Sequence, residues 1–170
     1  SLLENTLKTN GMIPGLHGVL AGAPKILEAY QALHQLFVDS SFNEEELTVV
    51  WQTINVEHAC HYCVPAHTGI AKMMKVDDAI TEALRNETPL ESSKLEALRT
   101  MTLTIVRNRG HVTQDDLDAF YAAGYGEAQV LEIILGLSQK TISNYVNHIA
   151  NTPVDAGFKK FAWSKESVVK

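Results

Sequence analysis

Cysteine is scarce in this sequence, which contains two cysteines, Cys60 and Cys63, among 170 residues. No apolar run approaches the ~18 residues that a membrane-spanning helix needs, and nothing at the N-terminus resembles a secretion or transit signal. We therefore expect a cytoplasmic protein with no membrane segment, a setting in which lasting disulfides are uncommon.

Positive charge is also limited. The net charge is −6, and the 14 lysines and arginines are scattered along the chain. A nucleic-acid-binding protein would normally carry a basic stripe, so we expect no nucleic-acid partner. The chain also lacks a Gly-rich phosphate loop, a Gly-x-Ser-x-Gly nucleophile turn and paired metal-binding carboxylates. These absences leave the region around the two cysteines as the most informative stretch.

Strand and hairpin patterns are missing as well, and the periodicity of the apolar residues predicts an all-α fold of about seven helices. The length predicts one domain, residues 1–170, in which four glycines and one proline make residues 1–22 partly irregular. The last expected helix is apolar on more than one side, which favours a central position or a subunit interface. The expected helices cover roughly residues 24–38, 43–56, 60–75, 77–86, 92–109, 113–123 and 127–149.

The two cysteines belong to the motif Glu57-x-x-Cys60-x-x-Cys63-x-x-x-His67. Residues three and four apart share one face of an α-helix. A helix here would place two thiols and an imidazole together, and Glu57 would join them if the helix reached back that far. Such a face suits proton transfer to and from a thiol.

Pro65 indicates where this helix begins. Proline is harmless only in about the first turn of a helix, so we expect the helix to begin near Cys60 to Tyr62. The positive end of a helix favours the thiolate, which is the reactive form of cysteine. We expect Cys60 to be the more exposed thiol and Cys63 to lie deeper, beside His67.

Other interpretations of the cysteine pair stay open. The pair could be a structural disulfide or two buried, inert thiols. Cys60, Cys63 and His67, with His58 or His61, could instead bind zinc, because these are ligand types that zinc prefers. Against zinc, the sequence has no further cysteine to supply a second ligand pair. The first-turn proline and His67 together favour a redox-active dithiol.

Three further residues are candidates for the site. Glu46 occupies the third position after Asn43, a capping box that accounts for it without chemistry. Glu57 follows the same helix beside the cysteines, either as a proton relay or as a solvated turn residue. His148 lies on the long last helix, which could pack against the cysteine helix, although a lone histidine there is more often a core residue.

Taken together, these segments resemble the alkylhydroperoxidase D (AhpD)-like branch of the carboxymuconolactone decarboxylase superfamily. The resemblance covers about residues 20–163. It rests on the cysteine motif, Val50-Trp51, Arg107-Asn108-Arg109-Gly110, Gly124-Tyr125 and residues 144–153.

The resemblance implies an all-helical fold that assembles as a homotrimer or homohexamer. It also implies a thiol peroxidase that needs no metal, haem or other cofactor. Its substrates would be organic hydroperoxides or hydrogen peroxide, and its reductant an external dithiol, a thioredoxin-like or lipoyl protein. By motif position, Cys63 would be the peroxidatic thiolate, Cys60 the resolving thiol and His67 the proton relay, assisted by a glutamate.

The sequence departs from this family at two positions. The best-known members place the assisting glutamate twelve residues before the first cysteine, where this chain has Thr48. Glu46 or Glu57 would then have to take its role. The residue before the second cysteine, a histidine in those members, is Tyr62 here.

Two functions of other classes remain as alternatives. The first is decarboxylation of a carboxymuconolactone, the other named activity of the superfamily, which does not need the dithiol. The second is a non-enzymatic oligomer that senses redox state or binds zinc through the same cysteines.

Overall fold

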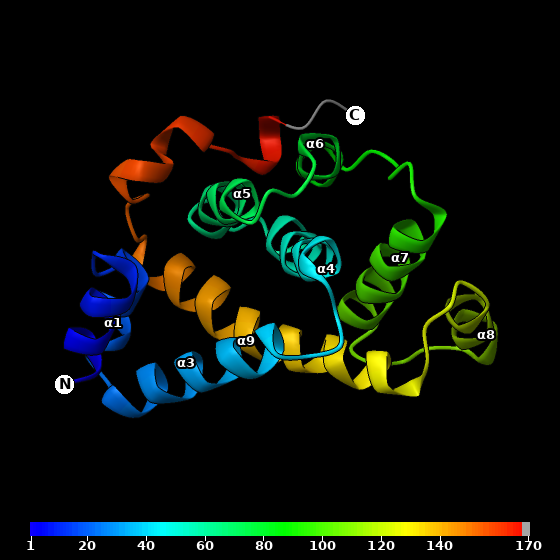
Figure 1. The fold of residues 1–170 in the computed structure, drawn as a ribbon, viewed down its shortest axis with the longest axis horizontal. Helices are drawn as coiled ribbons and strands as arrows, with labels where there is room; N and C mark the ends of the chain where they lie inside the picture. The colour runs from blue at the N-terminus through cyan, green and yellow to red at the C-terminus, as the bar shows by residue number, and fades with distance from the viewer. Residues whose placement is uncertain (168–170) are drawn as a thin grey trace.

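The computed structural model describes residues 1–167, which form nine α-helices and two short 3₁₀ helices, with no β-strand among them (Figure 1). The all-α prediction is therefore confirmed. No helix in this described part is long and apolar enough to cross a membrane. In chain order the elements are α1 (Leu2–Asn10), α2 (Gly15–Leu20), α3 (Pro24–Val38), α4 (Glu44–Glu57), α5 (Cys63–Met73), α6 (Asp78–Asn86), α7 (Ser93–Arg107), α8 (Gln114–Ala122), α9 (Glu127–Ala150), η1 (Ala156–Phe161) and η2 (Lys165–Ser167).

The expected number of helices is too low because two helices lie in the N-terminal segment. Ser1 caps α1: its hydroxyl accepts a hydrogen bond from the Glu4 backbone N–H, and the Glu4 side chain bonds back to Ser1. Gly11 ends this helix in a left-handed conformation (φ 70°), which glycine adopts at little cost. Residues 1–22 are partly irregular as expected, at 11–14 and 21–22, but the two helices beside these stretches were not expected, because Gly11 and Gly15 mark helix ends.

Helix α4 is the centre of the fold. Every residue from Glu46 to Val56 is buried, because α4 packs against α5, α6, α7 and α9. Figure 1 shows it surrounded by these four helices. Asn43 begins it with the predicted capping box, in which Asn43 and Glu46 bond each other's backbone N–H groups at 2.9 Å.

Helix α9 runs along α3 and beside α4 (Figure 1), so the longest helix is not the central one. Its buried face is mostly polar, whereas large apolar residues on its other side are exposed, Leu131 by 71% and Ile149 by 87%. The expected homotrimer or homohexamer stays a prediction. The buried residues of α9 are Ile133, Gly136, Gln139, Lys140, Ser143, Asn144 and Asn147.

Gly136 permits the close approach of α9 to α3 and α4. A Cβ atom there would lie 2.8 Å from Cε2 of Phe37 and 3.2 Å from Cγ1 of Val50. We expect Gly136→Ala to lower the free energy of unfolding by about 1–3 kcal/mol, since overpacking a core costs about that much. Urea denaturation measures the change.

Gly18 provides the matched control for this substitution. A Cβ atom at Gly18, within α2, would meet nothing within 4 Å. Gly18→Ala is expected to be neutral or to stabilise the protein by about 0.4–1 kcal/mol. Equal losses in both variants would show that the contact with Phe37 does not determine the cost.

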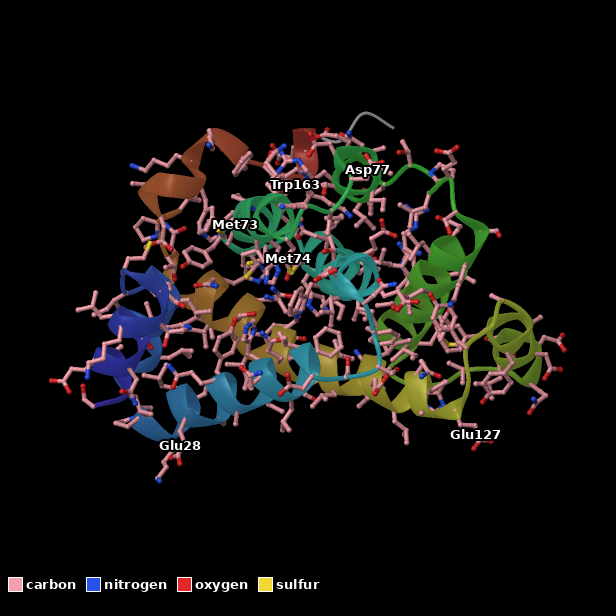
Figure 2. All side chains as sticks on the ribbon, viewed as in Figure 1. Glu28, Met73, Met74, Asp77, Glu127 and Trp163 are labelled. Atoms are coloured by element: carbon pink, nitrogen blue, oxygen red, sulfur yellow. The ribbon has the colours of Figure 1, made fainter. Side chains whose placement is uncertain are left out.

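The C-terminal segment packs back on α5 and α6. Phe158 of η1 lies directly against Gly69, where a Cβ atom would come within 2.4 Å of its ring. Trp163 lies near α6 (Figure 2) and its indole N–H donates to the Arg85 carbonyl at 3.0 Å. The Arg85 guanidinium donates in turn to the Phe161 carbonyl at 2.9 Å. This segment therefore covers the outer side of α5.

Candidate active site

The turn between α4 and α5 positions the two cysteines. The chain leaves α4 through Ala59, which has a left-handed conformation (φ 53°), and the Cys60 N–H donates to the Asn55 carbonyl at 2.9 Å. Helix α5 begins at Cys63, with Tyr62 as its cap residue and Pro65 in its first turn. The predicted start, near Cys60 to Tyr62, was thus one to three residues early.

Both cysteines are reduced and enclosed. The Cys63 backbone N–H donates to the Cys60 sulfur at 3.2 Å, so the two side chains lie at the same helix end. The expectation that Cys60 is the more exposed thiol is wrong, because Cys60 is 0% exposed and Cys63 is 2% exposed. The turn packs under an apolar cluster that the N-terminal helices contribute; it includes Leu16, Leu20, Leu27 and Tyr30.

The protein environment separates the acidities of the two thiols. Burial raises the pKa of the Cys63 thiol. The hydrogen bond from Cys60, the Lys140 ammonium and the Asn147 and Asn144 amides outweigh it and lower that pKa to about 5. The hydrogen bond to Cys63, together with burial, raises the pKa of Cys60 far above its usual range. This environment therefore favours the thiolate on Cys63 and the proton on Cys60.

Lys140 of α9 is the cation of this site. It is 1% exposed, and its Nζ lies 2.9 Å from His67 Nε2. Because an ammonium group only donates, His67 Nε2 accepts this bond and Nδ1 carries the ring proton. Burial, Lys140 and His34 hold the pKa of His67 well below its usual value, so His67 is neutral.

Buried amides complete the surroundings of the thiolate. Asn147 Nδ2 donates to Cys63 Sγ at 3.4 Å. Asn144 donates to Asn55 at 2.9 Å and its oxygen lies 3.0 Å from His58 Nδ1. Such fixed donors stabilise an anion without reorganising.

A second group of side chains holds the His67 ring from α4 and α9. The Trp51 ring packs against it with centroids 4.8 Å apart. The Trp51 indole N–H donates to Gln139 Oε1 at 2.8 Å, and Gln139 Nε2 lies 3.0 Å from His34 Nδ1. The ring is therefore fixed from two helices.

The two glutamate candidates make contacts away from the thiols. Glu57 accepts two hydrogen bonds from Arg107, at 2.8 and 2.9 Å, and these bonds lower its pKa. Glu46 caps α4 and accepts from Tyr125 at 3.0 Å, as its capping interpretation predicts. Within residues 1–167, neither carboxylate is hydrogen-bonded to His67 or to a cysteine.

His148 is exposed on α9. Its ring is stacked on that of His61, with centroids 6.5 Å apart, and His61 Nε2 lies 2.9 Å from the Thr152 carbonyl. Cys60, Cys63 and His67 of the motif therefore lie in the turn before α5 and in the first turns of α5. His148 lies on the surface beside His61.

The donor set does not suit zinc. The ring nitrogen of His67 that faces α9 is taken by the Lys140 ammonium, which would repel a metal cation. Among the described residues, no three His, Cys, Asp or Glu side chains are grouped as a metal site requires. The residues present are suited to a thiolate instead.

Sequence reasoning missed the contribution of α9. Lys140, Asn144 and Asn147 are spaced by four and three residues, so they share one helical face. They form a polar stripe on a helix that is otherwise rich in apolar residues. That stripe is the signal that could have indicated them, because buried lysine and asparagine residues need partners.

No protein-family model matches the chain. No curated protein matches it either. Among solved structures, it resembles an uncharacterized peroxidase-related protein with an alkylhydroperoxidase AhpD core from Ralstonia eutropha JMP134, with TM-score 0.81, 17% identity, and coverage of 92% of this chain and 84% of that one. The fold is that of the AhpD core.

Two further structures share the AhpD-like fold. A peroxidase-related protein from Silicibacter sp. TM1040 superimposes with TM-score 0.79 at 17% identity, covering 92% of this chain and 84% of that chain. A cysteine-to-alanine variant of the debrominase Bmp8, in complex with 2,3,4-tribromopyrrole, superimposes with TM-score 0.73 at 15% identity, covering 94% and 86%. The AhpD-like fold expected from the cysteine motif is thus confirmed.

Proposed function

We propose that this protein is a thiol-dependent peroxidase that reduces organic hydroperoxides or hydrogen peroxide through a dithiol–disulfide cycle. The observation that carries the proposal is the close pair of free thiols, in which the Cys63 N–H donates to the Cys60 sulfur at 3.2 Å. The surroundings lower the pKa of Cys63 and raise that of Cys60. A nucleophilic thiolate next to a protonated thiol is what a peroxidatic and a resolving cysteine require. The AhpD-like fold supports the same assignment.

The proposed cycle has two steps at the enzyme. The Cys63 thiolate attacks the terminal oxygen of the hydroperoxide; the O–O bond breaks, the sulfur is oxidised to a sulfenic acid and the alcohol leaves after taking one proton. The Cys60 thiol then attacks the sulfenic sulfur, a disulfide forms and water leaves with the thiol proton. An external dithiol, such as a thioredoxin-like or lipoyl protein, reduces the disulfide through a mixed disulfide.

The enclosure of the thiols constrains this last step. Leu16 N–H donates to the Tyr62 hydroxyl at 3.2 Å, and that hydroxyl donates to Asp155 at 2.6 Å. Asp155 also accepts from Gly15 N–H at 3.0 Å. These bonds tie the N-terminal and C-terminal segments across the cysteine turn, so a protein reductant reaches Cys60 only when the segments separate.

A thiol count tests the proposal directly. The reduced protein is mixed with one equivalent of an organic hydroperoxide, free thiols are counted over time, and the cysteine peptide is analysed by mass spectrometry. We expect rapid loss of both thiols and an intramolecular Cys60–Cys63 disulfide. Thiols that stay reduced would contradict the proposal, and conversion of a carboxymuconolactone by a cysteine-free double variant would favour the lyase alternative.

A further inference from the structure

The leaving oxygen takes one proton when the O–O bond breaks. Lys140, a buried cation beside His67, is the group that can supply this proton. A lysine is almost never fully buried unless it is paired, yet Lys140 forms no ion pair with a carboxylate in the part of the chain that the structure describes. Its contact is with neutral His67 at 2.9 Å. Its charge therefore needs another partner.

The groups around Lys140 offer one anion. Its charge acts on His67, Cys63 and Cys60 from α5 and the preceding turn, and on His34 from α3. Helix α4 adds Trp51, whose ring packs on that of His67. Burial lowers the pKa of His34 to about 4 and holds that of His67 well below its usual value, so neither histidine adds a charge. Cys63, whose pKa the Lys140 ammonium lowers, is the group that can carry the opposite charge.

We propose that Lys140 holds Cys63 ionised, sets the reduction potential of the Cys60–Cys63 pair, and supplies through His67 the proton that the leaving oxygen needs. The last part rests on the proposed peroxidase function. Lys140 acts through its neighbours and is a positioning residue. Lys140 takes the place of the glutamate that the resemblance implies. The proton then moves from Lys140 through His67 to the leaving oxygen, rather than from the thiol toward a glutamate.

The protons balance over one cycle. The resting site holds the Lys140 ammonium, the Cys63 thiolate and the Cys60 thiol. As the O–O bond breaks, His67 Nδ1 gives its proton to the alkoxide and Nε2 takes one from Lys140, which leaves a neutral amine. Water formation in the second step uses the Cys60 proton. The external dithiol brings two protons, one to Cys60 and one to Lys140, and the resting state returns.

This arrangement avoids an unpaired buried charge in the oxidised state. Once the thiolate is lost, Lys140 has no counter-ion, and burying an isolated ammonium is strongly unfavourable. Loss of its proton in the same step removes that cost. A cation that stabilises the thiolate also stabilises the reduced pair and makes the disulfide a stronger oxidant.

The test is Lys140→Met, which keeps the side-chain length and removes the charge. Three quantities are measured: the thiolate titration by ultraviolet absorbance, the equilibrium with a reference dithiol, and the rate with a hydroperoxide. We expect the pKa of Cys63 to rise above neutrality, and the equilibrium to shift about ten- to a hundredfold toward the disulfide, about 30–60 mV. Circular dichroism checks that the variant folds, because removing one partner of a buried pair usually destabilises a protein and His67 Nε2 loses its donor at 2.9 Å.

A second assay distinguishes the supply of the proton from the formation of the thiolate. Alkylation by iodoacetamide needs no proton, so its rate follows the thiolate fraction and the nucleophilicity of the sulfur, both of which also affect the hydroperoxide reaction. We expect Lys140→Met to lower the hydroperoxide rate about ten- to a hundredfold more than it lowers the alkylation rate. The upper figure is at the lower end of the usual contribution of general acid catalysis. Equal losses in the two reactions would overturn the proton role.

Two control variants decide the role of the charge. Lys159→Met removes a charge from an exposed lysine and should change none of the three quantities. Lys140→Arg keeps the charge, and it should retain most of the potential and the ionised Cys63. A folded Lys140→Arg that matches Lys140→Met, or a Lys140→Met that matches the wild type, would overturn the proposal. Failure of the wild type to consume peroxide, with the potential shift intact, would overturn the peroxidase function but not the charge role.

Discussion

Replacing Cys63 with serine is expected to lower peroxide turnover by on the order of 10³-fold or more, as removal of a nucleophile does in other enzymes. A serine hydroxyl is not ionised by the surroundings that lower the pKa of the Cys63 thiol to about 5, and it cannot form a sulfenic acid. Peroxide consumption in the presence of a small dithiol measures the loss. Retained turnover in Cys63→Ser would contradict the assignment of the peroxidatic thiol.

Cys60→Ser is the matched variant for this experiment. It removes the neighbouring sulfur 3.2 Å from the Cys63 N–H but leaves Lys140 and the amides around Cys63. We expect one rapid turnover that leaves a sulfenic acid, which a dimedone-type reagent traps for mass spectrometry. If Cys60→Ser loses the first step and Cys63→Ser keeps it, the two cysteines have exchanged roles.

Replacing Trp51 with alanine should cost about 3–5 kcal/mol of unfolding free energy, as other large-to-small core changes do. Trp51 is 1% exposed and its ring contacts Phe37 and His34, with centroids 5.4 and 5.7 Å apart. The substitution also leaves Gln139 without the indole donor at 2.8 Å. Chemical denaturation followed by circular dichroism measures the change.

Trp163→Ala is the control for that measurement, because the chain has two tryptophans. Trp163 packs in a small separate cluster with Val56 and Val64 near the C-terminal end. We expect a loss clearly below that of Trp51→Ala. Equal losses would mean that the contacts of Trp51 with α3 and α9 contribute little beyond its burial.

Local signals in the sequence predict most of the helices. Asn43 with Glu46 and Thr113 with Asp116 form the capping boxes that begin α4 and α8, and Pro24 opens α3. The same kind of signal, Ser1 with Glu4, begins α1. The four glycines within residues 11–22 are typical of turns, which is why the N-terminal helices were not expected.

The face shared by Cys63 and His67 also follows from the sequence, because a spacing of four residues is a property of the helix itself. Cys60 lies in the turn before α5, where its sulfur accepts from the Cys63 N–H at 3.2 Å. Pro65 indicates the start of that helix for an equally local reason. The proximity of the Cys63 thiol to a histidine therefore needs no tertiary information. The same holds for the family resemblance that these spacings carry.

The tertiary structure decides which groups meet this face. Lys140 lies 73 positions from His67 along the chain, and no local pattern brings such residues together. Packing also determines that Glu57 pairs with Arg107 and that Cys60 is enclosed by the N-terminal helices. The thiols and their spacing are thus properties of the sequence, whereas the charge that ionises one of them depends on how α9 packs against α5, because electrostatic energies depend on distance and burial in space.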